Sequence, residues 1–245
     1  MMQKVFTRPK TLKECLTHYC PGCGHGIAHR LIMEVVDELD IQGRTIGIAP
    51  VGCAVLAYDY LDVDMIEVAH GRAPAVATGM KRTSPDKIVF SYQGDGDLAA
   101  IGTAEIIHAA HRGEHFTVIF INNAVFGMTG GQMAPTTMLG QITATTQDGR
   151  NAAIHGYPLQ VSELLAILPG AVYVERCALC TAPQIRNAKK ALKHAFELQM
   201  NNTKGLSLVE LLSPCPTYWR MTPAKAMEWI EKEMTKVFPL GCIKG

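Results

Sequence analysis

Six short apolar segments alternate with helical patterns along the chain, and this alternation limits the fold more than any other feature. The segments are rich in β-branched and aromatic residues, as strands are. They are TIGIAP (45–50), MIEVAH (65–70), KIVFSYQ (87–93), FTVIFINN (116–123), AVYVERC (171–177) and LSLVELL (206–212). Helical periodicity covers 25–39, 97–112, 161–168, 182–199 and 223–237. Apolar strands separated by helices predict an α/β fold, a doubly wound parallel sheet with helices on both faces.

The whole chain fits one such domain. It has 245 residues, of which 48% are hydrophobic, and no shift in composition marks a second domain. We therefore predict a single domain over 1–245, with its core at about 20–217 and a C-terminal helical segment at 223–238. The stretch 124–160 is rich in Gly, Thr and Met and only weakly periodic. A loop of that length inside a compact domain is usually functional.

Charge and targeting signals exclude several classes of function. The formal net charge is +1, which gives no electrostatic reason to expect nucleic acid or an acidic membrane surface as a partner. No apolar stretch is long enough for a membrane span, and the N-terminus lacks the apolar region of a signal peptide. We expect a cytoplasmic protein. In a reducing compartment its eight cysteines point to metal or cluster ligation more than to disulfides.

Polar and thiol groups follow the predicted strands at the points where each strand ends. In parallel sheets these ends share one edge, where ligands bind. The groups in chain order are VGC with Cys53, HGR from His70, GDGD from Gly94 to Asp97, the pair Asn122 and Asn123, Cys177, and SPC with Cys215. We expect all of them to crowd one edge of the sheet.

The GDGD segment carries the clearest chemistry. Glycines before a helix let backbone N–H groups approach a phosphate. Asp95 could approach a diphosphate only through a cation, and Mg²⁺ takes oxygen ligands from carboxylates, amides and phosphate together. Asn123, at the next strand end, offers an amide oxygen. A GDG segment alone is an ordinary turn about as often as it is part of a binding site. The Asn pair one β-α-β unit later favours a site for Mg²⁺ and a diphosphate.

GDG, a spacer of 25 residues (97–121) and NN together resemble the thiamine diphosphate signature. Further segments resemble, in order, the β subunit of the 2-oxoacid:ferredoxin oxidoreductases, and they cover most of 20–217. They are CPGCGHG, VGC, HGRAPAVATG, GDGD, NNAVFGMTGGQMAPTT and SPCPT. The chain lacks the Gly-Lys-Ser/Thr of a P-loop, and it lacks the GxGxxG that follows a strand in a Rossmann site. The resemblance implies the thiamine-diphosphate-binding fold.

The resemblance also implies site residues. The Mg²⁺ ligands would be Asp95, Asn123 and the backbone carbonyl of Val125. The residues that bind or line the cofactor would be Val51, Gly52, Cys53, Ala54, His70, Gly94, Gly96, Asp97, Gly127 and Met128. The alternative for His70 is a turn histidine bonded to backbone, and Phe126 and Met128 could be core residues. No catalytic residue beyond cofactor positioning is expected in this chain.

For the cysteines, the resemblance implies a 4Fe–4S cluster held by Cys20, Cys23, Cys53 and Cys215. The competing interpretation is a zinc ribbon made of two CxxC pairs, Cys20 with Cys23 and Cys177 with Cys180. A thioredoxin-like dithiol is disfavoured because the first CxxC precedes any strand. Under the cluster interpretation the remaining cysteines, Cys15, Cys177, Cys180 and Cys242, are free thiols.

The implied function is oxidative decarboxylation of a 2-oxoacid to acyl-coenzyme A and CO₂, with reduction of ferredoxin. We expect a branched-chain substrate, 2-oxoisovalerate, with 2-oxoglutarate or pyruvate as alternatives. The pyrimidine domain and its activating Glu are missing, so an α subunit is implied, and small ferredoxin-like γ and δ subunits remain open. An apolar patch around Met128, Met133 and Met138 would face that partner. The other classes left open are a non-oxidative thiamine-dependent decarboxylase and a non-catalytic zinc-bound assembly subunit.

Overall fold

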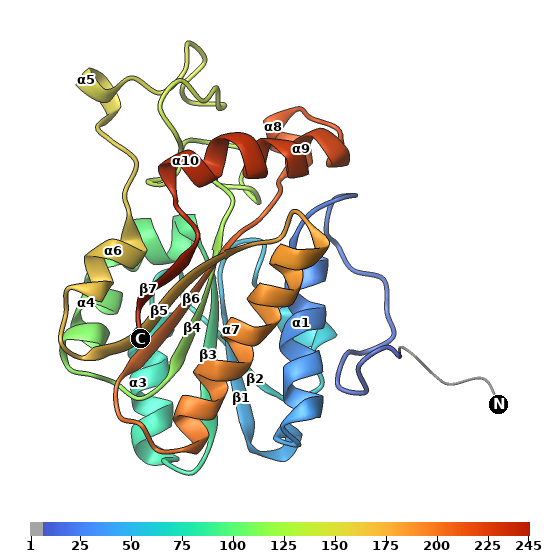
Figure 1. The fold of residues 1–245 in the computed structure, drawn as a ribbon, viewed down its shortest axis with the longest axis vertical. Helices are drawn as coiled ribbons and strands as arrows, with labels where there is room; N and C mark the ends of the chain where they lie inside the picture. Colours follow the sequence, from blue (N-terminus) through green and yellow to red (C-terminus); the bar gives the residue numbers. More distant parts are fainter. Residues whose placement is uncertain (1–6) are drawn as a thin grey trace.

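A computed structural model describes residues 7–245 and contains one seven-stranded sheet in the order β2-β1-β3-β4-β6-β5-β7 (Figure 1). The strands are β1 Thr45–Pro50, β2 Asp64–Val68, β3 Ile88–Gly94, β4 Thr117–Asn122, β5 Ala171–Ala178, β6 Leu206–Leu212 and β7 Gly241–Lys244. The first six pair in parallel, which confirms the predicted doubly wound parallel sheet. Of the seven strands within residues 7–245, only β7 runs antiparallel, beside β5.

Successive residues of the central strands are buried on opposite faces, as the continuous apolar runs predicted. Phe90 and Tyr92 of β3 face α1 and α7, and Val89 faces the helices on the other side. The first face is covered by α1 His25–Glu38 and α7 Ala182–Met200. The second is covered by α3 Ala73–Thr83, α4 Thr103–His111 and α6 Val161–Ala166 (Figure 1).

Among the elements that were not predicted are α3 and β7. Helix α3 contains Pro74 near its start and Gly79 within it, residues that weaken a helical sequence pattern. It forms because Ala73 and Ala77 are small enough to pack against the sheet. Strand β7 has four residues and no buried side, so its sequence lacks alternation. The helix predicted over 97–112 is also split, since Gly96–Ile101 (η2) is π-helical before α4 begins.

The carboxyl end of the sheet is covered by the C-terminal segment and by the long excursion between β4 and β5. Helices α8 Pro216–Trp219, α9 Pro223–Trp229, η3 Ile230–Met234 and α10 Thr235–Val237 lie across this end (Figure 1). They bury a third apolar cluster that includes Trp219, Ile230 and Phe238. Before α6 begins, the only helix of the excursion is the short α5 Ala152–His155.

The remaining short elements are η1 Gln42–Arg44 before β1 and α2 Ala57–Tyr60 after it. None of the helices within residues 7–245 is both long and apolar enough to cross a membrane.

Candidate functional site

Two adjoining cavities open at the carboxyl edge of the parallel strands. The first, which we call the strand-end pocket, is lined by His25, Val51, Gly52, Cys53, Ala54, His70, Gly94, Asp95, Gly96, Asp97, Asn123, Val125, Phe126, Gly127, Met128 and Thr129. Every residue predicted to bind the cofactor or Mg²⁺ is in this set. The structure therefore brings together four loops that are distant in sequence. Three further lining residues, His25, Phe126 and Thr129, were not among the predicted ligands.

Asp95 lies at the end of β3 and caps the helix that follows. Its Oδ1 accepts from the Gly96 N–H at 2.8 Å, and its Oδ2 accepts from the Thr136 hydroxyl at 2.7 Å. Burial raises the pKa of Asp95 to about 7, although these hydrogen bonds oppose the shift. A carboxylate that is so costly to ionise when buried favours a nearby cation.

Asn123 and Val125 present oxygens toward Asp95. The end of the Asn123 amide that faces Asp95 lies 2.8 Å from the carbonyl oxygen of Val125 and 3.3 Å from Asp95 Oδ2. With the amide oxygen at that end, three oxygens face one another with no proton to join them. With the amide nitrogen there, the side chain donates to both. The position needs either a donor or a cation, and the three oxygens suit a hard cation such as Mg²⁺.

A strained turn holds these oxygens in place. Ala124, between Asn123 and Val125, is buried and has a positive φ of 56°, a conformation that non-glycine residues seldom adopt. The turn is fixed because Ala124 N–H donates to the Asn122 side chain (3.2 Å) and the Ala124 carbonyl accepts from Thr137 (2.6 Å). The backbone strain is thus located at the pocket.

A buried charge network anchors this turn to the sheet. Asn122 donates to Glu210 on β6 (2.7 Å), and Glu210 accepts from Arg176 on β5 (2.7 Å). Arg176 is 1% exposed and also forms a bidentate pair with Glu163. Removing one member of such a buried set leaves an uncompensated charge. This network could not be predicted from local patterns, because its contacts join residues that are 13 to 88 positions apart.

Asp97 has a role that differs from a direct phosphate contact. Its Oδ1 accepts from the His70 ring and from the Gly71 N–H (2.6 Å), and its Oδ2 accepts from Gln93 (2.6 Å). His70 therefore has a side-chain partner, and it is oriented toward the pocket by a carboxylate. Any contribution of Asp97 to a diphosphate would come from its backbone at the start of η2.

Glycines allow the loops to approach one another. A Cβ on Gly96 would overlap the Phe126 ring, and one on Gly127 would lie 3.1 Å from the Cys53 sulfur. Phe126 is thus packed over the GDGD turn, and Gly127 separates the first cavity from the second.

The second cavity, which we call the cysteine cavity, is lined by His18, Tyr19, Cys20, Cys23, His25, Cys53, Asn123, Gly127, Met128, Cys215, Pro216, Thr217 and Tyr218. All four cysteines of the predicted cluster site line it. The loop of the first CxxC pair is docked on the end of β6, since Gly24 N–H donates to the Pro214 carbonyl (3.1 Å). A Cβ on Gly24 would overlap the Ser213 hydroxyl, so glycine is required for this approach.

Three of the four thiols lie in an environment that disfavours negative charge without a metal. Burial raises the pKa of Cys53 to about 12, and it also raises the pKa of Cys23 and of Cys215, with the neighbouring sulfurs adding to the shift. Two backbone N–H groups oppose it, that of His25 at Cys23 and that of Tyr218 at Cys215. Iron would supply the positive charge that four thiolates need.

The second CxxC pair lies elsewhere. Cys177 is in the core between the sheet and α7, 3.7 Å from a Glu175 oxygen, and Cys180 is packed in the cluster under the C-terminal helices. Neither lines the cysteine cavity. Among residues 7–245, no three His, Cys, Asp or Glu side chains form a group that could hold a single metal ion. Cys15 and Cys242 are exposed.

His25 was not predicted to be functional, although it lines both cavities. It lies two positions after the first CxxC pair, and that position was the available signal. Its Nδ1 lies 2.6 Å from the Tyr92 hydroxyl, and burial lowers the pKa of His25 to about 3. The ring is therefore a neutral group at the boundary between the cavities.

Comparisons with known proteins agree with this geometry. A family model described as "Thiamine pyrophosphate enzyme, C-terminal TPP binding domain" matches residues 50–211, so the protein is a thiamine diphosphate (TPP) enzyme domain. The chain is 50% identical over 250 residues to "Ketoisovalerate oxidoreductase subunit VorA" of Methanothermobacter thermautotrophicus, covering 98% of this chain and 52% of that protein. It is 39% identical over 205 residues to "2-oxoglutarate synthase subunit KorB" of Methanocaldococcus jannaschii, covering 82% of this chain and 70% of that protein.

A solved structure is also similar. It is a 2-oxoglutarate:ferredoxin oxidoreductase from Magnetococcus marinus with 2-oxoglutarate, coenzyme A and succinyl-CoA bound. The TM-score is 0.77 at 26% identity, covering 97% of this chain and 84% of that chain. The chain thus belongs to the TPP-binding subunits of the 2-oxoacid:ferredoxin oxidoreductases. It spans about half the length of the VorA proteins that it matches.

Proposed function

We propose that this chain is the TPP-binding β subunit of a branched-chain 2-oxoacid:ferredoxin oxidoreductase. The enzyme would convert 2-oxoisovalerate and coenzyme A to the acyl-CoA and CO₂, with electrons passing to ferredoxin. The observation that carries this proposal is the adjacency of the two cavities. Cys53, Asn123 and Gly127 line both of them, so a thiamine site and a four-cysteine site share a wall.

In the strand-end pocket the chain would hold the diphosphate end of the cofactor. Asp95, Asn123 and the Val125 carbonyl would bind Mg²⁺, because their oxygens face one another and no protein cation lies among them within the described residues. Backbone groups of Gly96, Asp97, Gly127 and Met128 and the start of η2 would hold the diphosphate. Gly94, His70 and the Val51–Ala54 turn would line the rest. When bound, thiamine would supply the nucleophilic carbon for the 2-oxo group and an acceptor for the electron pair of the bond that breaks as CO₂ leaves.

In the cysteine cavity Cys20, Cys23, Cys53 and Cys215 would hold a 4Fe–4S cluster, whose chemistry is one-electron transfer. The placement beside the thiamine pocket supports an oxidative enzyme over a non-oxidative decarboxylase, which has no use for an electron acceptor there. It also disfavours the zinc-bound assembly subunit, since Cys177 and Cys180 do not join Cys20 and Cys23.

The lining of the pocket supports a branched-chain substrate. Val51 and Met128 are the exposed apolar side chains of the strand-end pocket, at 38% and 44% exposure. Neither cavity is lined by a Lys or Arg within the described residues, so this chain offers no cation for the second carboxylate of 2-oxoglutarate. The relative at 50% identity is named a ketoisovalerate oxidoreductase subunit. Pyruvate and 2-oxoglutarate remain the alternatives.

Partner subunits would complete the site. We propose an α subunit with the pyrimidine domain and the activating Glu, since no Glu lines the strand-end pocket in the described part of the chain. Small γ and δ subunits of the ferredoxin type would carry further clusters. Nucleic acid and membranes are not expected partners.

The partner surface differs from the expected methionine patch. Met128 is exposed, but Met138 is buried at 7% exposure. The exposed apolar side chains of the excursion are instead Leu139, Ile142, Ile154 and Tyr157. We propose that this surface contacts the α subunit.

A reducing cytoplasm is the compartment that suits the thiols. All eight cysteines are free, and exposed thiols such as Cys15 persist best where disulfides do not form.

The test of the substrate is coenzyme-A-dependent reduction of a viologen dye by the complete complex, purified without oxygen. We expect kcat/KM for 2-oxoisovalerate to exceed the values for 2-oxoglutarate and pyruvate by at least about tenfold, the range that a pocket contact or two can discriminate. A preference for 2-oxoglutarate would contradict the substrate but not the reaction class.

The test of the cluster site is iron analysis of single Cys→Ser variants. Serine is a poorer ligand for this soft site, so variants of the four cysteines that line the cysteine cavity should lose iron. Cys177→Ser and Cys180→Ser are matched controls, because both thiols are buried outside that cavity. Iron loss in the Cys177 variant with iron retained in the Cys53 variant would restore the zinc-ribbon interpretation.

A further inference from the structure

His25 borders both cavities, yet no role above uses its side chain. It is the first residue of α1, two positions after Cys23, and only 2% exposed. A buried imidazole is costly unless its nitrogens have partners. The position therefore calls for a polar ring between the thiamine pocket and the four thiols.

Tyr92 fixes which ring nitrogen carries the proton. Its hydroxyl lies 2.6 Å from His25 Nδ1, and its ring is fully buried. Within residues 7–245 this hydroxyl has no other hydrogen-bond partner, so it would be an unsatisfied donor if it did not donate to Nδ1. Since Nδ1 accepts, the neutral ring of His25 carries its proton on Nε2.

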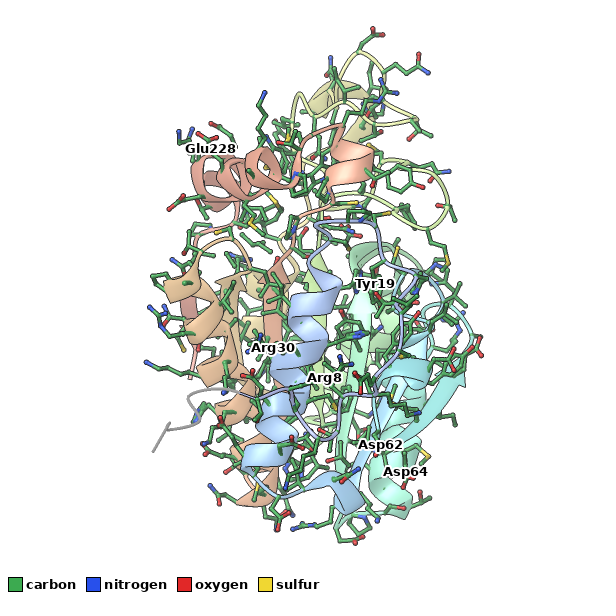
Figure 2. The ribbon with its side chains drawn as sticks, turned by 90° about the vertical axis from the view of Figure 1, so that its right-hand side faces the viewer. Arg8, Tyr19, Arg30, Asp62, Asp64 and Glu228 are labelled. Atoms are coloured by element: carbon green, nitrogen blue, oxygen red, sulfur yellow. The ribbon has the colours of Figure 1, made fainter. Side chains whose placement is uncertain are left out.

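Tyr19 fixes the plane of the ring. Its own ring stacks on His25 with centroids 4.6 Å apart and planes 3° apart, and its hydroxyl lies 3.2 Å from His29 Nε2. Tyr19 lies beside the N-terminal end of α1, at the end of the sheet that the C-terminal helices cover (Figure 2). With one face under Tyr19 and Nδ1 bonded to Tyr92, the Nε2 edge is the part of the ring left to face the cavities. In the described part of the chain no protein acceptor is bonded to Nε2.

We propose that His25 donates a hydrogen bond from Nε2 to a sulfur of the cluster and so stabilises its reduced form. The proposal rests on the proposed function, because it requires the cluster held by the four cysteines. Reduction adds negative charge to the cluster, and donors to its sulfurs favour the more negative state. The backbone N–H of the same residue also lowers the pKa of Cys23, against the effect of burial, so His25 would serve the site twice.

His18 is the other imidazole on the cysteine cavity. Its Nδ1 lies 2.8 Å from the Tyr60 hydroxyl, which also accepts the His18 backbone N–H. However, His18 is exposed, so water competes for its Nε2 proton. This difference favours His25 as the donor.

The first test is a reductive titration of the complete, cluster-loaded enzyme followed by EPR. In His25→Phe the ratio of reduced to oxidised cluster at a fixed potential should fall about tenfold, which is about 59 mV for a one-electron couple. His29→Phe is the matched control: His29 is equally buried and also bonds a tyrosine hydroxyl, but it lines neither cavity. No shift in His25→Phe, or an equal shift in both variants, would overturn the proposal.

A second test needs no destabilising variant. Wild-type enzyme containing histidine labelled with ¹⁵N in the ring alone should show a ¹⁵N coupling to the reduced cluster by pulsed EPR, and His18→Gln should retain it. A loaded cluster without this coupling, or loss of the coupling in His18→Gln, would overturn the role of His25 and leave the proposed function standing. Wild-type enzyme with no iron and sulfide would overturn both.

Discussion

Replacing Asp95 by Asn should stabilise the cofactor-free chain at neutral and alkaline pH. In the folded chain, burial raises the pKa of Asp95 from 3.8 to about 7. Between these two pH values the folded state holds a proton that the unfolded state has released. The contribution of Asp95 to the free energy of unfolding of wild type is therefore fully present below about pH 4, and it is lost as pH rises toward 7. Each pKa unit is about 1.4 kcal/mol, which gives about 4 kcal/mol over the whole range and about 3 kcal/mol between about pH 5 and pH 8.

The Asp95→Asn side chain fits the same contacts. Its oxygen can accept from the Gly96 N–H, and its amide nitrogen can donate to the Thr136 hydroxyl, which rotates to accept. The amide is neutral at every pH, so the variant lacks the cost of ionisation. The same change removes a carboxylate ligand and should abolish Mg²⁺-dependent TPP binding.

The assay is urea unfolding of both chains in a chelator, from about pH 5 to about pH 8. The free energy of unfolding of wild type should fall relative to that of Asp95→Asn by about 3 kcal/mol. Calorimetric titration with Mg²⁺ and TPP should give binding to wild type alone. Parallel stability profiles would refute the claim that burial protonates Asp95, and tight TPP binding by the variant would refute its role at the metal.

Three more predictions concern two contacts around the cavities and the activity of the isolated chain. Trp219→Phe removes the indole N–H that donates to the Asn123 carbonyl (3.0 Å) and should weaken Mg²⁺-TPP binding about fivefold in a calorimetric titration. Trp229→Phe, which replaces the neighbouring indole 4.4 Å away, should leave binding unchanged, and equal weakening in both variants would point to packing alone. Gly24→Ala should lower the iron content because its Cβ meets Ser213, whereas Gly26→Ala, with open space around it, should keep iron; equal iron contents would contradict the docking argument. The isolated chain should reduce a viologen dye at background rate and self-associate, and addition of the α subunit should restore turnover; strong activity of the isolated chain would place the activating group here.

The sheet and its functional edge were predictable because they depend on local patterns. Apolar runs such as 116–123 gave the strands, and the rule that parallel strands end at one edge placed Cys53, Asp95 and Cys215 together. That rule also placed Cys177 there, but its side chain lies in the core. Strand order alone does not say which way a terminal side chain points.

The supporting contacts could not be predicted, since they depend on registers between distant segments. Thr136 reaches Asp95 across 41 residues, and Tyr92 reaches His25 across 67. The resemblance implied candidate ligands, but the groups that orient those side chains, such as the Asp97 carboxylate at His70, emerged only from the packing of the loops.

The adjacency of a TPP site and a four-cysteine cluster site is the central claim, and it is tested most directly by analysing the anaerobically purified chain for iron, sulfide and zinc alongside its visible and EPR spectra. We expect about four irons and four sulfides per chain with negligible zinc, and a reducible signal that disappears in Cys53→Ser, the thiol that borders both cavities. One zinc per chain without sulfide, retained in Cys53→Ser and lost in Cys177→Ser, would contradict the account.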